Sequence, residues 1–299
     1  MLSSSTPRTS QPRPRSAAPR SRAASPGRSG SADGLRVRHL ARGAEDGYHC
    51  GLVPGLHSSA DAQSLAAELA FASSRLAVLE QSPPGLYAAV SEGQVEERTW
   101  LAFLIAYIGP LEEGDPFVEI ERVRTSWASG ELPALESLRT GPRTAHDPVR
   151  GSRTLAAYAA WARRAGSQAA AFTGEAGWTP QRRFERTFER LALPGLHRDA
   201  RFELLSLLGR LGVYELAAPS LKFGGDNEVT VAAKRALGIA DPLLLDRRAA
   251  ELARACGIPL EAIDLALYNW GTGTHVNAGA PAAEHPEALE RIQAALGLR

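Results

Sequence analysis

Three consecutive helices between residues 226 and 270 each carry a start signal and a stop signal, and this stretch constrains the fold most. Asp, Asn or Pro at the start of a helix satisfies or replaces the free N–H groups of its first turn. Glycine after the last turn adopts the left-handed conformation that ends a helix. The start signals are Asp226-Asn227, Asp241-Pro242 and Ile258-Pro259, and the stop signals are Gly238, Gly257 and Gly271. This pattern predicts short helices joined by tight turns.

The rest of the chain also shows helical periodicity, and no useful stretch alternates apolar and polar residues as a strand would. Residues 86–109 predict the most buried helix, because Trp100 to Ile108 leave almost no polar face. Further helices are predicted over 58–82, 154–172, 180–191, 198–211 and 286–296, and short ones near 117–127 and 132–138 within a loop region of residues 110–153. We therefore predict an all-α fold.

Residues 1–33 form a basic tail that is rich in Ser, Pro, Arg and Ala and lacks hydrophobic periodicity. Such a segment cannot bury enough apolar surface to offset its ordering entropy, so we predict that it is disordered. It is either an arm attracted to DNA or an extension upstream of the true start, and we favour the second interpretation. Residues 34–299 then form a single all-helical domain, with a potential division into sub-domains 34–150 and 151–299.

The formal charge of +1 is unevenly distributed along the chain, because residues 1–32 hold six arginines and no acid. The remainder is mildly acidic, which argues against broad nucleic-acid binding but leaves room for a local basic groove. Cys50 and Cys256 lie far apart without metal-ligand spacing, which fits a reducing cytoplasm. No apolar run approaches the roughly 20 residues that span a bilayer, so a membrane partner is not expected.

The turn Leu193-Pro194-Gly195 lies between two predicted helices and resembles the turn of helix-hairpin-helix modules. In those modules, backbone N–H groups of the hairpin contact a DNA phosphate, assisted by the positive end of the following helix. The turn predicts that Pro194 and Gly195 bind phosphate together with Arg198 and Arg201. His197 stands where such hairpins usually carry a second glycine, and a simple break between two helices is the alternative interpretation.

Asp226 and Lys234 are the candidate catalytic residues. A carboxylate at a helix N-terminus is stabilised by the helix dipole, and in an open site it can activate an amine or water. Lys234 is one of only two lysines in the chain and can serve as a phosphate-binding charge or a nucleophile. The structural alternatives are an ordinary N-cap for Asp226 and a solvated helix face for Lys234.

Several further residues complete the candidate site. Arginines in the two helices predicted to begin at Asp226-Asn227 and at Asp241-Pro242 are expected to hold phosphate. Residues that are aromatic or lie close to aromatic residues in the sequence are expected to line a pocket. The phosphate candidates are Arg235, Arg247 and Arg248, and the pocket candidates are Glu97, Trp100, Asn269 and Trp270. A charged first turn explains Glu97 equally well, and ordinary core packing explains the two tryptophans. No ligand set for a metal and no motif for a cofactor is found in the sequence.

Taken together, the Pro194 hairpin, the Gly225-Asp226 corner, Ala232-Ala233-Lys234-Arg235 and the ending at Leu267–Trp270 resemble the α-glutamyl/putrescinyl thymine pyrophosphorylase family, which is helical and related to DNA glycosylases. The resemblance covers residues 48–275 and is clearest in 184–270. It implies a helix-hairpin-helix, DNA-glycosylase-like fold and a step in the hypermodification of thymine in DNA. A small amine or amino acid would attack an activated 5-hydroxymethyluracil that is flipped out of the duplex, and pyrophosphate would leave. Asp226 would take the proton, and the arginines would hold the pyrophosphate.

Two other functions remain open at this point. A DNA glycosylase would use Asp226 to stabilise the sugar cation and Lys234 to form a Schiff base. A non-catalytic helical module that binds DNA or another partner is slightly favoured by the acidic body of the chain.

Overall fold

The computed structural model describes residues 43–282 and 285–298, and within these ranges helices are the only regular secondary structure, which confirms the all-α prediction. The predicted disordered tail of residues 1–33 lies outside the described residues. The helices are α1 (Ser59–Gln81), α2 (Leu86–Ser91), α3 (Val95–Ile108), α4 (Val118–Val123), the 3-10 helix η1 (Trp127–Ser129), α5 (Gly151–Arg164), α6 (Gln168–Thr173), α7 (Pro180–Arg190), α8 (Arg198–Arg210), α9 (Glu228–Leu237), α10 (Pro242–Cys256), α11 (Ala262–Thr272) and α12 (Pro286–Ala295). None of the helices in the described ranges is both long and apolar enough to cross a membrane.

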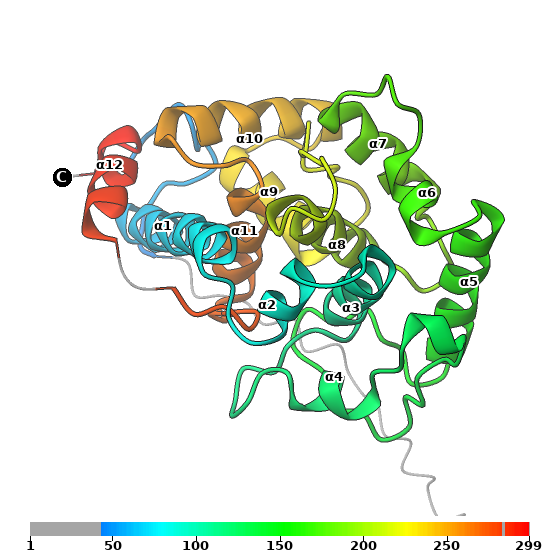
Figure 1. Ribbon diagram of the computed structural model, residues 1–299. Helices are drawn as coiled ribbons and strands as arrows, with labels where there is room; N and C mark the ends of the chain where they lie inside the picture. Colours follow the sequence, from blue (N-terminus) through cyan, green and yellow to red (C-terminus); the bar gives the residue numbers. More distant parts are fainter. Residues whose placement is uncertain (1–42, 283–284, 299) are drawn as a thin grey trace, which may run out of the picture. The chain divides into compact units, whose positions relative to one another are not determined.

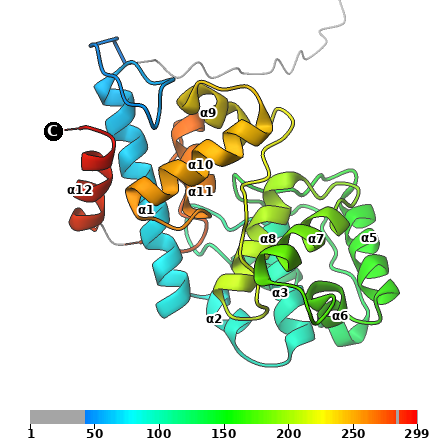
Figure 2. The ribbon, with the colours of Figure 1, turned by 90° about the horizontal axis from the view of Figure 1, so that it is seen from above.

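The helices pack in two groups that do not follow the order of the chain. In one group α1 packs against α11 and α12, and α9 and α10 complete the layer around α11 (Figure 1). In the other group α3 packs against α2, α6 and α8, while α7 joins α6 to α8 (Figure 2). The expected division at residue 150 does not coincide with these groups, because α1 packs with the C-terminal helices.

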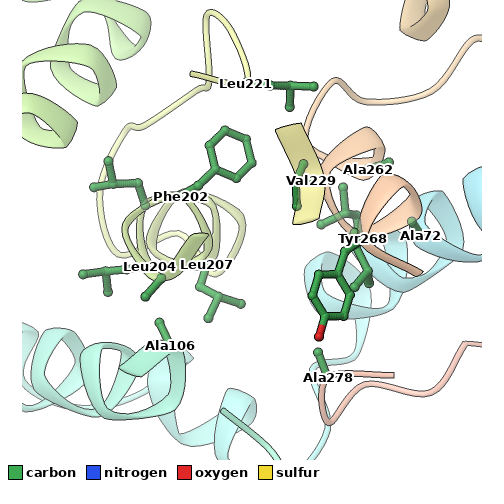
Figure 3. Packing of buried hydrophobic residues seen from close by; sticks show 14 of the residues in the cluster. Ala72, Ala106, Phe202, Leu204, Leu207, Leu221, Val229, Ala262, Tyr268 and Ala278 are labelled. Atoms are coloured by element: carbon green, nitrogen blue, oxygen red, sulfur yellow. The ribbon is translucent and has the colours of Figure 1, made fainter. Parts of the chain in front are cut away.

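Helix α8 connects the two groups through its buried side chains. Leu204 and Leu207 point toward Ala106 of α3, while the side of the core formed by α9 and α11 holds Val229 and Tyr268 (Figure 3). These residues belong to one continuous cluster of buried apolar side chains. The turn before α8 and the loop after it are therefore anchored on a shared core.

Helix α3 is buried on all sides, as its sequence predicts, but the prediction of one helix over residues 86–109 is wrong. Gly93 has a φ of +87° and separates α2 from α3. Phe103 lies at the centre of α3 with its ring centroid 3.8 Å from that of Tyr158 and 5.4 Å from that of Trp100. The break lets α3 point its aromatic face at α5.

Two further sequence predictions fail for local reasons. The helix expected over residues 154–172 is divided into α5 and α6 at Gly166, which has a φ of +95°. Residues 132–138 form extended backbone and a turn instead of a helix. By contrast, the predicted ends of α9 and α10 at Gly238 and Gly257 are confirmed, and both glycines are left-handed.

Candidate functional site

The hairpin between α7 and α8 requires glycine at its centre. Gly195 has a φ of +77°, and a Cβ atom there would lie 2.2 Å from Oγ1 of Thr154. The backbone N–H of Leu196 donates to the carbonyl of Leu193 at 3.1 Å and closes the turn. Pro194 and His197 are exposed, and His197 directly precedes the first turn of α8. The free N–H groups at the start of α8 therefore lie at a solvent-exposed turn.

Arg198 does not face solvent, contrary to its expected place in a phosphate clamp. Its side chain is 8% exposed, and its guanidinium donates to the carboxylate of Asp264 and to the carbonyl of Leu221. The carboxylate of Asp199 lies 3.0 Å from the same guanidinium. These acceptors lie inside the protein, so the charge of Arg198 is neutralised there. Its hydrogen bond to the carbonyl of Leu221 holds the loop after α8 in place.

Arg201 is also turned onto the protein. Its guanidinium carbon lies 4.4 Å from the ring centroid of Phe188, and Nη1 donates to the carbonyl of the same residue at 3.1 Å. Burial, followed by the nearby charge of Arg198, lowers the pKa of Arg201. The two arginines of α8 thus brace the hairpin from inside instead of extending toward a ligand.

The exposed positive charge beside the hairpin comes from α7. Arg182, Arg186 and Arg190 are exposed and follow one another at a spacing of four residues, so they share one face of the helix. We call these three residues the α7 arginine strip. Trp178 packs under it, with the guanidinium of Arg182 at 5.8 Å and that of Arg190 at 5.1 Å from its ring. The strip provides a local basic surface, which the mildly acidic charge of the rest of the chain does not exclude.

A buried ionic cluster lies where α8 meets α11 and α1, and the sequence analysis did not find it. Asp264 pairs with both Arg143 and Arg198, while Glu203 pairs with Arg75 at 2.9 Å and lies 3.7 Å from Arg143. Burial alone would raise the pKa of Asp264, but the charges of Arg198 and Arg143 outweigh it and the pKa is lowered. The charges of the three arginines are therefore balanced within the cluster, by buried Asp264, half-buried Glu203 and, at Arg198, Asp199. The sequence feature that could have revealed this cluster is Asp264, because it is an acidic residue within the apolar run of α11.

The Asp226 corner precedes α9 and is open to solvent. Asn227, not Asp226, caps α9, since its Oδ1 accepts from the N–H of Thr230 at 2.9 Å. The side chain of Asp226 is 95% exposed, and one carboxylate oxygen lies 3.6 Å from Nζ of Lys234. The structure therefore brings the two candidate catalytic residues together. A carboxylate paired with an amine at the start of a helix can exchange a proton with a bound group.

Arg235 of α9 and Trp270 of α11 also meet, and the side chain of Arg235 is partly exposed there. The guanidinium of Arg235 lies 4.5 Å from the ring of Trp270 and 3.5 Å from the carboxylate of Asp61. The indole N–H of Trp270 donates to the carbonyl of Asp61 at 3.1 Å. These contacts fasten α9 and α11 to α1, so Trp270 packs in the core and does not line an open pocket.

Asn269 is buried and connects α11 to α1. Its Nδ2 donates to the carboxylate of Glu68 at 2.9 Å and to the carbonyl of Val276 at 3.3 Å. Its Oδ1 has no hydrogen-bond partner among the described residues. The amide therefore orients Glu68, a residue that the sequence analysis did not single out.

The remaining candidates have local partners. Glu97 accepts from the hydroxyl of Ser126 at 2.6 Å and from the N–H groups of Trp127 and Ala128, each at 3.0 Å, so it anchors η1. Burial opposes the charge of Glu97, but these hydrogen bonds outweigh it and lower its pKa.

Trp100, Arg247 and Arg248 likewise have structural contacts. The indole N–H of Trp100 donates to the carbonyl of Thr125 at 2.9 Å, and its ring stacks in the aromatic core. Arg247 and Arg248 lie on the exposed face of α10, where both pair with Glu251 at 3.2 Å and 2.9 Å. None of these three side chains contacts the Asp226 corner in the described part of the chain.

No family model, no curated protein and no solved structure matches this chain.

Proposed function

We propose that the protein acts on bases in DNA, where an amine displaces pyrophosphate from an activated 5-hydroxymethyluracil. The observation that carries this proposal is the exposed carboxylate of Asp226, which follows a glycine-dependent hairpin and lies 3.6 Å from the amine of Lys234. The order of hairpin, carboxylate and helix is that of helix-hairpin-helix DNA glycosylases, and we assign the fold to that type on the same grounds. The flipped base would approach the open face of the Asp226 corner.

The proposed reaction balances with the groups at this corner. The amine nitrogen forms a bond to the methylene carbon as the bond from that carbon to oxygen breaks, and pyrophosphate leaves with the electron pair. The proton released by the amine passes to the carboxylate of Asp226. Lys234 provides a positive charge beside the leaving group.

Duplex binding is assigned to the hairpin and the α7 arginine strip. The free N–H groups at the start of α8 can bind one phosphate, and the strip can bind the backbone on either side of it. Because each neutralised phosphate releases counterions, binding through the strip must weaken steeply with salt.

Replacing Arg182, Arg186 and Arg190 together with alanine should abolish most DNA binding and flatten its salt dependence. Fluorescence anisotropy with a labelled duplex at several salt concentrations measures both effects, and the salt slope should fall by about 2–3. The matched control replaces Arg247, Arg248 and Arg254, three exposed arginines of α10, and should leave the slope unchanged. Equal losses in both triple variants would contradict the assignment of the strip.

Replacing Asp226 with asparagine should abolish product formation on DNA that contains 5-(pyrophosphoryloxymethyl)uracil, while DNA binding and the melting temperature stay unchanged. Mass spectrometry of the digested DNA measures the aminated base. Asp241→Asn is the control, since it removes the same charge from a helix start and asparagine retains the cap. Unchanged turnover by the Asp226→Asn variant would refute the catalytic assignment.

The same DNA substrates test the glycosylase alternative. A glycosylase that uses Lys234 would release free base and form a Schiff base that borohydride traps as a covalent protein–DNA adduct. Base release together with an adduct that is lost in the Lys234→Arg variant would replace the transferase assignment.

A non-catalytic interaction module is the second candidate, and exposed apolar residues near the start of α9 and α10 favour it. Leu243 is 80% exposed, and Val231 and Leu244 are each 50% exposed. Surface leucines of this kind are common in partner-binding faces. An intact protein that binds DNA, forms no product and loses a partner when Leu243 is replaced with serine would support this function.

A further inference from the structure

A pocket lies between α1 and the start of α12. Figure 2 shows these two helices in the group that does not contain the hairpin between α7 and α8. The pocket has a volume of about 510 Å³. One wall is formed by α1, with Glu68 and Phe71. The described residues of the other wall are His275, Asn277 and Ala282 after α11, and His285, Pro286 and Leu289 at the start of α12. None of its lining residues belongs to the Asp226 corner, so this pocket is independent of the proposed function.

A carboxylate–histidine pair is built into the wall of this pocket. Nδ1 of His275 lies 3.0 Å and 3.1 Å from the two carboxylate oxygens of Glu68, and the ring of Phe71 packs at 4.2 Å from the imidazole. The buried amide of Asn269 donates to the same carboxylate at 2.9 Å. The pair is therefore fixed from two elements: by α11 through Asn269 and by α1 through Phe71.

This arrangement determines which nitrogen of His275 remains available. Nδ1 faces the two carboxylate oxygens of Glu68, so in the tautomer that carries the proton on Nδ1 the acceptor lone pair lies on Nε2. No described residue hydrogen-bonds to Nε2 of His275. The side chain is 49% exposed, so a ligand in the pocket can reach the ring.

The charge of the pocket favours a cationic ligand. Glu68 is the one carboxylate among its described lining residues, and no lysine or arginine lines the described part of its wall. His275 and His285 are the remaining titratable groups that line it. The other lining side chains are largely apolar, with Phe71, Pro286 and Leu289 the largest. An anionic ligand would find no lysine or arginine here, whereas an ammonium group would find the carboxylate of Glu68, whose side chain is 17% exposed.

We infer that this pocket binds a small protonated amine with an aromatic or alkyl body. The ammonium group donates to the carboxylate of Glu68 and to Nε2 of His275, and the body of the ligand packs between Phe71 and Leu289. Asn269 is a positioning residue in this site, because it holds the carboxylate toward the pocket from the buried side.

Isothermal titration calorimetry with benzylamine, benzyl alcohol and benzoate tests this inference, because the three probes share a ring and differ in charge. Benzylamine should bind at least tenfold more tightly than benzyl alcohol, and benzoate should give no measurable heat. Glu68→Gln should weaken benzylamine at least tenfold and leave benzyl alcohol unchanged. Benzyl alcohol binding as tightly as benzylamine would overturn the inference.

Two further variants keep the test decisive. Glu290→Gln removes the same charge from the exposed face of α12 and should leave benzylamine affinity unchanged. Leu289→Trp fills the pocket from α12 without replacing the charged pair and should abolish binding, with the melting temperature as a check on folding. Wild-type affinity in the Leu289→Trp variant would show that the amine binds elsewhere.

Discussion

Replacing Asp264 with asparagine should lower the free energy of unfolding by about 3–5 kcal/mol, which is the cost of breaking a buried ion pair by removing one partner. Asp264 is 2% exposed and is the shared acceptor of Arg143 and Arg198, whose side chains are each 8% exposed. The asparagine has nearly the same shape, so the loss would arise from two buried guanidinium groups that lose the buried carboxylate they share and keep only Asp199 and Glu203 nearby. Urea denaturation followed by circular dichroism measures the change.

Glu251→Gln is the matched control for Asp264→Asn. Glu251 pairs with two arginines as well, but on the exposed face of α10, and we expect a change below about 1 kcal/mol. The pKa of Asp264 is lowered in the folded state, so its stabilisation is complete above the unfolded pKa of about 4 and is lost as the pH falls through the lower folded value. The wild-type protein should therefore lose stability below about pH 4, and the Asp264→Asn variant should lose less. Equal stability of Asp264→Asn and Glu251→Gln would contradict the importance of the buried cluster.

Replacing Phe103 with alanine should cost about 3–5 kcal/mol of unfolding free energy. Phe103 is fully buried at the centre of α3, and its ring stacks on Tyr158 at 3.8 Å, on Trp100 at 5.4 Å and on Tyr107 at 5.6 Å. The truncated side chain would leave a cavity among large rings that cannot close it without moving α3 against α5. Thermal and urea denaturation both report this loss.

Phe103→Leu separates the volume of the ring from its stacking. Leucine retains much of the apolar volume, so this variant should lose less than half as much stability as Phe103→Ala. A loss of less than about 1 kcal/mol for the alanine variant would mean that the aromatic cluster relaxes around the gap. Phe71→Ala is no substitute control, because Phe71 lines the α1–α12 pocket.

The helices that sequence analysis located best are those whose ends are set by local interactions. Asn227 and Asp241 accept from N–H groups within their own first turns, and Gly238 and Gly257 adopt left-handed conformations that other residues rarely reach. These signals act over four or five residues, so they can be recognised without knowing the fold. Gly93 and Gly166 also have positive φ angles and interrupt helices. The apolar residues on both sides of each glycine keep helical spacing, which favoured one continuous helix in the sequence analysis.

The candidate site was only partly predictable, because the direction of a long side chain depends on tertiary contacts. Arg198 and the exposed Arg182 look alike in the sequence, yet one pairs with Asp264 from a helix 66 positions later and the other stays in solvent. Asp226 and Lys234 were each singled out from the sequence, and their pairing spans only the eight positions from the turn before α9 to its last turn. Glu68 and His275 could not be paired in advance, because more than two hundred residues separate them.

The packing of α1 on the C-terminal helices has a consequence for synthesis on the ribosome. The apolar face of α1, with Leu65, Leu69 and Leu76, is buried largely against α11 and α12, and the hydroxyl of Tyr48 reaches the carbonyl of Leu296 at 2.7 Å. α11 and α12 follow the whole of the α2–α8 group in the chain, so they leave the ribosome after it. Until they emerge, most of the native packing of α1 cannot form, and its apolar face waits for its main partners.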